Sequence, residues 1–382
     1  MRILHVTDCY LPRIGGIEMH VRDLCRAQRD AGHDALVVTA TAAGPNAESD
    51  DPWVHRLRPD ARLLLSSATG GDGLAGLLDQ YRPDVVHAHV SVFSPFTVGA
   101  ARQAAAAGLP TLVTVHSMWQ GPVRRVMRAL LLGLSREPVA WSAVSRSAAE
   151  PVRAVLADRV PVLVLPNAVD PGWWRSEPAP VPAVPTIVSV MRLARRKRPL
   201  ALARMLRKVR ATLPADLPLR AVIVGDGPQR PALEAYLARH ATSWVEVRGR
   251  LDREQIRSLY AESTVYAAPA TLESFGIAAL EARSAGLPVV ASTRGGVGEF
   301  VTDGVDGLLA HDDDDMVAAL VRLVGDATLL ASITAHNRAE VPRLDWPAAC
   351  TASLAAYAVA ARRAGTEAVG STLAQAVAGQ RS

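Results

Sequence analysis

The sequence predicts an α/β protein with two domains, each built around a doubly wound, mostly parallel sheet. Three observations support this fold class. The chain has 382 residues, more than one domain usually holds. Apolar strand-like runs alternate with helical patterns in both halves. A Pro-rich segment, residues 171–185, separates the two series and is typical of a linker. We therefore expect domains over residues 1–170 and 186–345.

Composition narrows the classes of partner and compartment. Hydrophobic residues make up 49% of the chain and charged residues 21%, as in ordinary globular proteins. The net charge of +5 suits phosphate-bearing ligands or an anionic surface, but no nucleic-acid motif accompanies it, so we expect no nucleic-acid partner. Three cysteines without a CxxC pair favour a reducing compartment. No apolar run approaches the ~20 residues of a membrane-spanning helix, and the N-terminus lacks a signal-peptide pattern, so we expect a cytoplasmic protein.

The first half opens with a strand at residues 2–7, the Gly15-Gly16 pair and a helical pattern. The glycine pair indicates either close backbone approach to a phosphate or sugar, or a turn that requires positive φ. It is not the GxGxxG fingerprint, which disfavours a nicotinamide enzyme. The remaining elements expected in this half are strands at 35–39, 84–89, 109–116, 140–145 and 162–165 and an Ala-rich helix at 97–107.

The second half repeats the same alternation. We expect strands at 186–191, 220–224 and 244–248, and helices at 199–213, 228–239, 252–261 and 314–325. A long Ala-rich helix is expected at 346–363, and the small, polar residues 364–382 are expected to be disordered.

Residues 264–300 contain the most unusual pattern, a strand, a turn, a helix, a second strand and a Gly-Gly turn. Glu281 lies in an apolar helical segment, where a carboxylate is costly unless a polar partner stabilises it. Glu273 and Ser274 fall at the expected helix start, where free N–H groups favour an anion. This combination predicts a ligand with a phosphate and a diol, such as a nucleotide-sugar.

Other candidate residues follow strands of the second half. Arg192 and Lys197 come after the strand at 186–191 and could hold phosphate oxygens, although charge alone favours a solvated basic loop. Gly225 and Gly227 could line a nucleotide site or form a simple strand-to-helix turn. The acidic run Asp312–Asp315 precedes a helical pattern, so we predict N-capping rather than metal binding.

Three histidines end strands in the first half. His116 could contact a sugar or transfer a proton, or be structural. We expect His87 and His89 to point to opposite faces of their strand. Since no third ligand lies nearby in the sequence, metal binding there is disfavoured. Residues 122–134 form a basic amphipathic helical pattern, which predicts either contact with an anionic membrane or packing against its own domain.

Taken together, these motifs resemble the retaining, GT-B-fold glycosyltransferases of family four. Glu273 and Glu281 lie in ESFGIAALEA with the spacing of that family's EX7E signature. The other matching motifs, in the family's order, are GGIEMHV (15–21), PDVVHAHV (83–90), VTVHS (113–117), PNAVD (166–170), MRLARRK (191–197) and VGDGP (224–228). The resemblance covers residues 1–361. It implies two Rossmann-like domains around an interdomain cleft, with helix 346–363 crossing back to the N-terminal, acceptor-binding domain.

The resemblance also implies residue roles. Arg192 and Lys197 would bind the donor diphosphate, and Glu281 the ribose hydroxyls. Glu273, with the backbone of Ser274–Ile277, would hold the sugar and phosphate. The expected catalytic set is His116, Glu273, Arg192 and Lys197. The expected donor-binding set is Gly15, Gly16, Arg192, Lys197, Gly225, Gly227, Arg250, Leu251, Glu273, Ser274, Phe275, Gly276, Ile277 and Glu281.

The implied activity is transfer of a hexose, with retention and without metal or other cofactor, from GDP-mannose or a UDP-sugar. Lipid, inositol or glycan would be the acceptor, and contact through residues 122–134 would place the protein at the inner face of a membrane. Two departures from the family pattern are Met191 and Ala168, where glycine is usual. The alternatives are a sugar-nucleotide epimerase of the same fold and a non-enzymatic basic docking protein.

Overall fold

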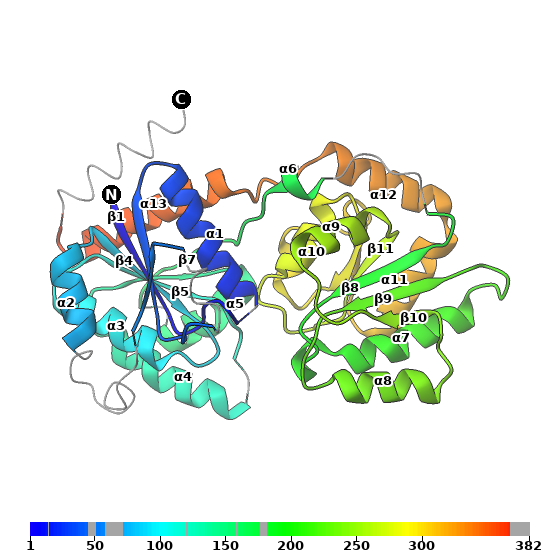
Figure 1. Ribbon diagram of the computed structural model, residues 1–382, viewed down its shortest axis with the longest axis horizontal. Coiled ribbons are helices and arrows are strands. Elements are labelled where there is room, and N and C mark those ends of the chain that lie inside the picture. The colour runs from blue at the N-terminus through cyan, green and yellow to red at the C-terminus, as the bar shows by residue number, and fades with distance from the viewer. Residues whose placement is uncertain are drawn as a thin grey trace. The chain divides into compact units, whose positions relative to one another are not determined.

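The computed structural model describes residues 1–13, 15–44, 51–57, 72–119, 121–157, 159–175 and 182–366. The chain divides into two compact units, seen in Figure 1. Unit 1 comprises Met1–Ala168 and Trp346–Ser382, and unit 2 comprises Val169–Asp345. The helix α13 (Trp346–Arg363) therefore belongs to unit 1, although it follows unit 2 in the sequence.

Unit 1 is a doubly wound α/β unit with a seven-stranded parallel sheet in the order β3-β2-β1-β4-β5-β6-β7. Its strands are β1 (Arg2–Thr7), β2 (Asp34–Thr39), β3 (Val54–Arg56), β4 (Val85–Val90), β5 (Thr111–Val115), β6 (Ala140–Ala143) and β7 (Val162–Val164). Its helices besides α13 are α1 (Gly16–Asp30), α2 (Asp72–Tyr81), α3 (Pro95–Ala106), α4 (Gly121–Leu134) and α5 (Arg146–Leu156).

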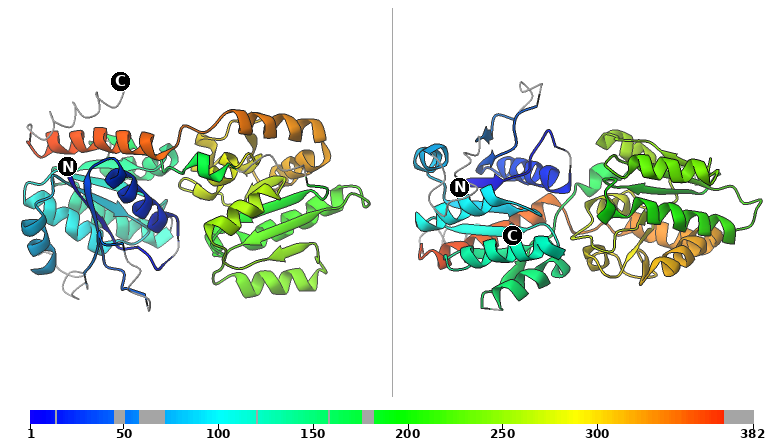
Figure 2. Two further views of the ribbon diagram at one scale, coloured as in Figure 1. Left: turned by 45° about the horizontal axis from the view of Figure 1, so that its top comes forward. Right: turned by 90° about the horizontal axis from the view of Figure 1, so that it is seen from below.

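The sheet of unit 1 is buried on both faces, as expected for parallel strands. Side chains of β1 alternate between the faces, so Ile3 packs with residues of α1 and α13, and Leu4 packs with residues of α2 and α3. All six residues of β4 are buried. Figure 2 shows α1 and α13 at the sheet of unit 1 in two further views. Polar side chains on these central strands therefore lie in a dry interior.

Unit 2 is also doubly wound, with a six-stranded parallel sheet in the order β10-β9-β8-β11-β12-β13. Its strands are β8 (Thr186–Val190), β9 (Arg220–Val224), β10 (Val245–Val247), β11 (Val265–Ala268), β12 (Val289–Ser292) and β13 (Gly307–Ala310). Its α-helices are α6 (Pro171–Trp174), α7 (Pro199–Thr212), α8 (Arg230–Arg239), α9 (Arg253–Ala261), α10 (Ile277–Ser284), α11 (Asp313–Gly325) and α12 (Ala327–Ala339).

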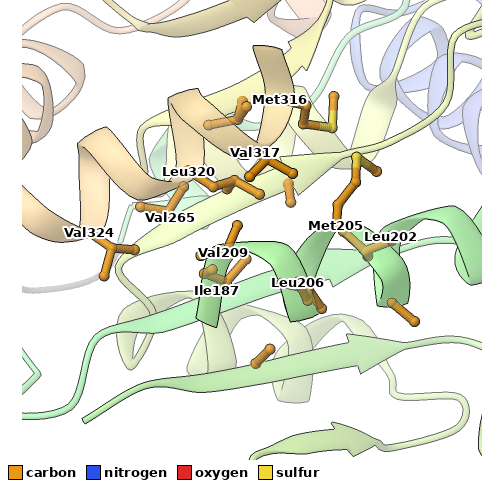
Figure 3. Close-up of a cluster of buried hydrophobic side chains, with 14 of the residues drawn as sticks. Ile187, Leu202, Met205, Leu206, Val209, Val265, Met316, Val317, Leu320 and Val324 are labelled. Carbon is orange, nitrogen blue, oxygen red and sulfur yellow. The ribbon is translucent and has the colours of Figure 1, made fainter. Parts of the chain in front are cut away.

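One apolar cluster fixes α7 and α11 against the sheet of unit 2. Leu202, Leu206 and Val209 of α7 are buried with Leu320 of α11 and Ile187 of β8, as Figure 3 shows. These side chains recur at helical spacing in α7, which explains why this segment is helical and which face it buries. The loop between β8 and α7 is thereby anchored at both ends.

The backbone of that loop also packs closely on the turn after β9. Gly225 and Gly227 have φ values of 128° and 154°, in the range that favours glycine. A Cβ atom on Gly225 would lie 1.8 Å from the carbonyl oxygen of Met191, and one on Gly227 would lie 2.6 Å from that of Leu193. These glycines therefore allow the turn after β9 to support residues 191–193.

The predicted fold class is confirmed, and most strands and helices lie within two residues of their expected bounds. The predictions for β1, β9 and α13 match the structure in full. The elements β3, α2, α5, β13 and α12 were not predicted. Of the expected linker, residues 171–174 form α6, and residues 176–181 lie outside the described residues. Of residues 364–382, which are expected to be disordered, 367–382 also lie outside the described residues.

Helix α4 coincides with the predicted basic amphipathic segment. Met127, Leu131 and Leu134 are completely buried within unit 1, where α4 packs against α3 and α5. Arg125 and Arg128 are exposed. The apolar stripe is thus explained by packing against its own unit.

In the described part of the chain, no single helix has the length and apolar character needed to cross a membrane. The adjacent helices α11 and α12 reach that length and composition only together, and they meet at a bend of 93°.

Candidate active site

The most promising site in unit 2 lies where the sheet order reverses. The adjacent strands β8 and β11 lead to neighbours on opposite sides, β9 and β12. Ligands of doubly wound sheets bind beyond the carboxyl ends of strands at such a reversal. Residues 191–198 follow β8, and residues 269–276 follow β11. Of the predicted donor-binding residues, these two loops contain Arg192, Lys197, Glu273, Ser274, Phe275 and Gly276.

The structure joins two of the predicted catalytic residues. Lys197, from the loop after β8, forms an ion pair with Glu273, from the loop after β11. Their side chains are 22% and 17% exposed, so solvent screens this pair less than a surface pair. Arg192, in the same loop as Lys197, is exposed and makes no ion pair with any described residue. One cation is therefore held by Glu273 and the other faces solvent.

Arg198 braces the same two loops and was not among the predicted site residues. It donates to the carbonyl oxygen of Pro269 at 3.1 Å and to Oδ2 of Asp313 at 2.7 Å. The first bond ties the loop after β8 to the loop after β11, and the second ties it to the start of α11. In the sequence, Arg198 is one member of a run of basic residues, and no local pattern indicates that its side chain rather than a neighbour's makes these contacts.

The expected helix start at Glu273 and Ser274 is wrong, because α10 begins at Ile277. Gly276 precedes the helix with φ 96°, a left-handed conformation that ends the preceding loop. Glu273 and Ser274 instead lie in that loop, which the Gly295-Gly296 turn covers. The N–H of Gly296 donates to the carbonyl oxygen of Glu273 at 2.8 Å. A Cβ atom on Gly296 would lie 2.4 Å from the carbonyl oxygen of Ser274.

Glu281 lies on α10 and is 9% exposed, as its apolar surroundings predict. Tyr266 lies on the neighbouring strand β11, and its hydroxyl donates to the carbonyl oxygen of Val190, the last residue of β8, at 3.1 Å. Burial, followed by the charges of Glu273 and Glu281, raises the pKa of Tyr266 far above its ordinary value. Both carboxylates therefore lie near enough to Tyr266 to disfavour its ionised form. Tyr266 was missed because a tyrosine in a buried strand is typical of a core residue.

The remaining predicted donor-binding residues of unit 2 occupy supporting or exposed places. Gly225 and Gly227 support the loop after β8, as described above. Arg250 is exposed, with its Nε 4.0 Å from Oδ2 of Asp226, and Leu251 is half-buried. Phe275 is buried against Phe300, with ring centroids 5.3 Å apart.

Asp312 caps α11, as predicted. Its carboxylate accepts hydrogen bonds from the N–H groups of Asp314 and Asp315, each at 2.9 Å. Asp313 is paired with Arg198, and Asp314 with Lys208. The acidic run is thus used for capping and ion pairs.

In unit 1, the Gly15-Gly16 pair precedes α1. Gly15 has φ −171°, which is extended backbone, so a need for positive φ does not explain it. A Cβ at this position would lie 2.5 Å from the carboxylate of Glu18, which also pairs with Arg13 at 3.2 Å. A side chain at this position would require only the end of the flexible Glu18 side chain to shift.

The expectation that His87 and His89 point to opposite faces is wrong. Residues two apart on a strand share a face, and the two ring centroids are 4.0 Å apart. His5, from the neighbouring strand β1, brings a third ring to this face, which the spacing within one strand could not reveal. Ring nitrogens of His5, His87 and His89 lie within 4.8 Å of one another, so a third possible ligand lies nearby in space although none lies nearby in the sequence.

A hydrogen-bond chain uses these ring nitrogens. His116 Nε2 lies 3.0 Å from His89 Nδ1, His89 Nε2 lies 2.9 Å from His5 Nδ1, and His5 Nε2 lies 2.7 Å from Gln28 Oε1. His87 bonds through Nδ1 to Tyr357 and through Nε2 to Thr114. Because all six ring nitrogens of His5, His87 and His89 are engaged, we assign no metal to them.

Burial keeps these histidines neutral. It lowers the pKa of His5 and of His20 to about 4, and that of His87, His89 and His116 well below 6.5. Interactions with neighbouring histidines lower the pKa of the last three further. His116 itself is 4% exposed, and the His20 ring lies 5.5 Å away, centroid to centroid.

Two family models match the chain. "Glycosyltransferase Family 4" matches residues 14–173, and "Glycosyl transferases group 1" matches residues 184–326. Among curated relatives, the Mycobacterium tuberculosis glycogen synthase is 29% identical, covering 95% of this chain and 95% of its own. A phosphatidylinositol N-acetylglucosaminyltransferase subunit of Arabidopsis thaliana is 27% identical, covering 88% of this chain and 77% of its own.

Two solved structures illustrate the shared architecture. Sucrose-phosphate synthase from Thermosynechococcus elongatus has a TM-score of 0.73 at 18% identity, covering 91% of this chain and 96% of its own. Anabaena HepE in complex with UDP-glucose has a TM-score of 0.68 at 20% identity, covering 99% and 100%. Fold and relatives together define a glycosyltransferase enzyme with the GT-B fold. The chain belongs to glycosyltransferase family four.

The buried histidines predict that acid destabilises the protein. A histidine whose pKa is lower in the native than in the unfolded state takes up a proton on unfolding. Above pH 6.5 the histidine is neutral in both states and does not reduce the free energy of unfolding. As the pH falls from 6.5 toward the native pKa, the free energy of unfolding decreases, because the unfolded state binds the proton more tightly. For His5 and His20, with native pKa values of about 4, the loss at pH 4 is roughly 3 kcal/mol each. Urea unfolding between pH 4.5 and 7.5 measures this slope.

His20 gives the cleanest variant, because its Nδ1 has no hydrogen-bond partner among the described residues. His20→Leu should reduce the number of protons taken up on unfolding by up to one, whereas His311→Gln, at an exposed position, should not. An unchanged slope in His20→Leu would contradict the interpretation.

Proposed function

We propose that unit 2 binds a nucleoside-diphosphate sugar at the carboxyl ends of β8 and β11, and that the enzyme transfers its hexose to a lipid, inositol or glycan acceptor. The observation that carries this proposal is the pairing of Lys197 with Glu273 at the reversal of strand order. A cation and a carboxylate side by side at that edge suit a ligand that has both phosphate oxygens and sugar hydroxyls.

Charge and position suggest the role of each residue. Glu273 offsets part of the charge of Lys197, so the exposed Arg192 and the N-terminal end of α10 add to the positive potential that Lys197 offers a diphosphate. Glu273 accepts hydrogen bonds from hydroxyls of the donor sugar. Glu281, buried one turn and more into α10, accepts those of the ribose. The predicted contact of His116 with the donor sugar belongs to the same proposal.

The reaction is proposed to retain the configuration at the anomeric carbon and to need no divalent metal. Arg192, Lys197 and the start of α10 stabilise the charge that grows on the leaving phosphate, and that phosphate helps to deprotonate the acceptor. The engagement of Asp312, Asp313 and Asp314 in capping and ion pairs supports a metal-independent reaction, because this acidic run is the motif that could otherwise have suggested a metal site.

The relatives support a nucleotide-sugar donor, but they do not favour one acceptor class over another. The HepE structure was solved with UDP-glucose. The named relatives include a glycogen synthase and a phosphatidylinositol N-acetylglucosaminyltransferase. D-inositol 3-phosphate glycosyltransferase of Rhodococcus erythropolis is 35% identical over 153 residues, 38% of this chain. UDP-sugars and GDP-mannose both remain within the proposal. Membership of the family overturns the interpretation of the chain as a non-enzymatic docking protein.

Peripheral contact with an anionic membrane through residues 122–134 also stays a proposal. Its support is the exposure of Arg125 and Arg128 together with Val126, which is 49% exposed. Flotation with phosphatidylserine-containing vesicles at low and high salt tests it, and equal recovery without vesicles would reject it.

Nucleoside diphosphate is expected to raise the melting temperature by a few degrees at about 100 times its Kd. Lys197→Ala and Glu281→Ala should abolish this shift, because they remove a phosphate-binding cation and a ribose-binding carboxylate. Lys208→Ala is the matched control, since Lys208 is an exposed lysine paired with Asp314. If both site variants respond like the unaltered protein, the site assignment is wrong.

A panel of uridine, guanosine and adenosine diphosphate sugars should identify the donor. Without acceptor, a glycosyltransferase hydrolyses its own donor slowly, so one donor should release nucleoside diphosphate faster than the others. Analysis of the same mixture separates the alternative function, because an epimerase of this fold would convert the sugar without acceptor. Hydrolysis of every donor at the rate in buffer would reject the proposed donor class.

A further inference from the structure

A continuous chain of buried hydrogen bonds runs from strand to strand along one face of the sheet of unit 1 and ends at His116. It involves α1, β1, β4, β5, β6 and α13, and its members are Gln28, His5, His89, His116, Tyr357, His87, Thr114 and Ser142. None of these side chains except His116 belongs to the predicted site. Each neutral imidazole in this hydrogen-bond chain has a single N–H group. The donor-to-acceptor direction of the hydrogen bonds therefore determines which nitrogen of each ring carries the proton.

The direction is set at the end remote from His116. The Ser142 hydroxyl donates to the carbonyl oxygen of Val113 at 3.4 Å, and a carbonyl oxygen can only accept. Ser142 must therefore accept the bond from Thr114, at 2.6 Å. With its only hydrogen used, the Thr114 hydroxyl accepts from His87 Nε2, also at 2.6 Å. His87 is thereby the Nε2–H tautomer, with Nδ1 as an acceptor.

The direction continues through α13 and α1. Since His87 Nδ1 accepts, the Tyr357 hydroxyl at 2.9 Å donates to it. Tyr357 in turn accepts from Nε2 of Gln28 at 3.0 Å. This places Oε1 of Gln28 toward His5, where it accepts from Nε2 of His5 at 2.7 Å. The side-chain amide of Gln28 therefore joins the hydrogen bonds of Tyr357 and His87 to those of His5, His89 and His116.

The last two bonds reach His116. His5 Nδ1 has no proton and accepts from His89 Nε2 at 2.9 Å. His89 Nδ1 then accepts from His116 Nε2 at 3.0 Å. His116 is left with its proton on Nε2 and a bare lone pair on Nδ1. The lowered pKa values of His5, His89 and His116 support this assignment, because a protonated ring anywhere would break the single direction.

We propose that this chain is a positioning device that holds His116 as the Nε2–H tautomer, so that Nδ1 accepts a hydrogen bond from a hydroxyl of the donor sugar. The contact to the sugar rests on the proposed function, whereas the tautomer rests on the chain alone. Gln28, His5 and His89 are positioning residues in this scheme. A ring fixed through buried partners loses less freedom on binding than a ring that must select a tautomer.

The chain also has a second self-consistent state. If every bond reversed, the Gln28 amide would turn over and His116 would become the Nδ1–H tautomer, a donor where it had been an acceptor. The reversed chain leaves the carbonyl oxygen of Val113 without its bond from Ser142. Removing the Ser142 hydroxyl should therefore favour reversal, because in the original direction Thr114 would then have no acceptor.

Histidine-selective ¹⁵N labelling and long-range ¹H–¹⁵N correlation spectra at pH 7.5 test the proposal on the full chain without substrate. In the unaltered protein, His5, His87, His89 and His116 should all be Nε2–H tautomers. An Nδ1–H signal from His5, His89 or His116 as the main form would overturn the proposal.

Ser142→Ala provides the coupling test, because it changes no histidine and removes one hydroxyl. The ratio of Nδ1–H to Nε2–H forms of His116 should rise about five-fold or more, the effect expected of one lost hydrogen bond. Ser263→Ala is the matched control, as Ser263 is a buried serine that donates to the carbonyl oxygen of Leu259 in unit 2. An unchanged His116 ratio in Ser142→Ala would overturn the proposal.

Activity measurements test the proposed contact between His116 and the sugar separately from the hydrogen-bond chain. In Ser142→Ala, kcat for donor turnover should fall by about the fraction of His116 that has changed tautomer. The Kd for nucleoside diphosphate should stay as in Ser263→Ala, since that affinity is assigned to residues of unit 2. A shifted tautomer with unchanged kcat would overturn the contact between His116 and the sugar. Because the spectra need no donor, they judge the chain even if the proposed function fails.

Discussion

The architecture of both units depends on one constraint, that parallel strands end at the same edge of their sheet. In unit 2 this constraint brings the segment after β8 to the segment after β11, although some 70 residues separate them in sequence. The Lys197–Glu273 ion pair and the bonds of Arg198 form at that edge. Glycines at 225, 227 and 296 then let backbone pack on backbone, so the charged side chains stand on a rigid support.

In unit 1 the same constraint has a different chemical consequence. Adjacent parallel strands place His5, His87 and His89 in register on one buried face, where desolvation opposes their protonation. A buried polar group is costly unless it is hydrogen-bonded, and these rings satisfy one another and Gln28 and Tyr357. Helix α13 supplies Tyr357, so the end of the chain completes the polar interior of unit 1.

The two units therefore offer complementary kinds of site. Unit 2 presents charges in partly exposed loops, which can exchange a protein partner for a ligand at modest cost. Unit 1 presents His116 at the end of a dry, directional hydrogen-bond chain, in which a change at one member is felt by the others. The first arrangement suits recognition of an anion, and the second suits control of a single hydrogen-bonding position.

The sequence by itself determined the doubly wound class, the order of most elements and the identity of the family, because apolar periodicity, strand-end motifs and their spacing are local properties. It also identified Lys197, Glu273, Glu281 and His116 as residues of interest. Only the tertiary structure decided that Lys197 pairs with Glu273, that α10 begins at Ile277, and that His87 and His89 share a face with His5. These outcomes depend on which strands are neighbours and on single φ angles such as that of Gly276, and no local pattern encodes either. The direction of the histidine chain goes further still, because it follows from hydrogen bonds among residues drawn from six separate elements.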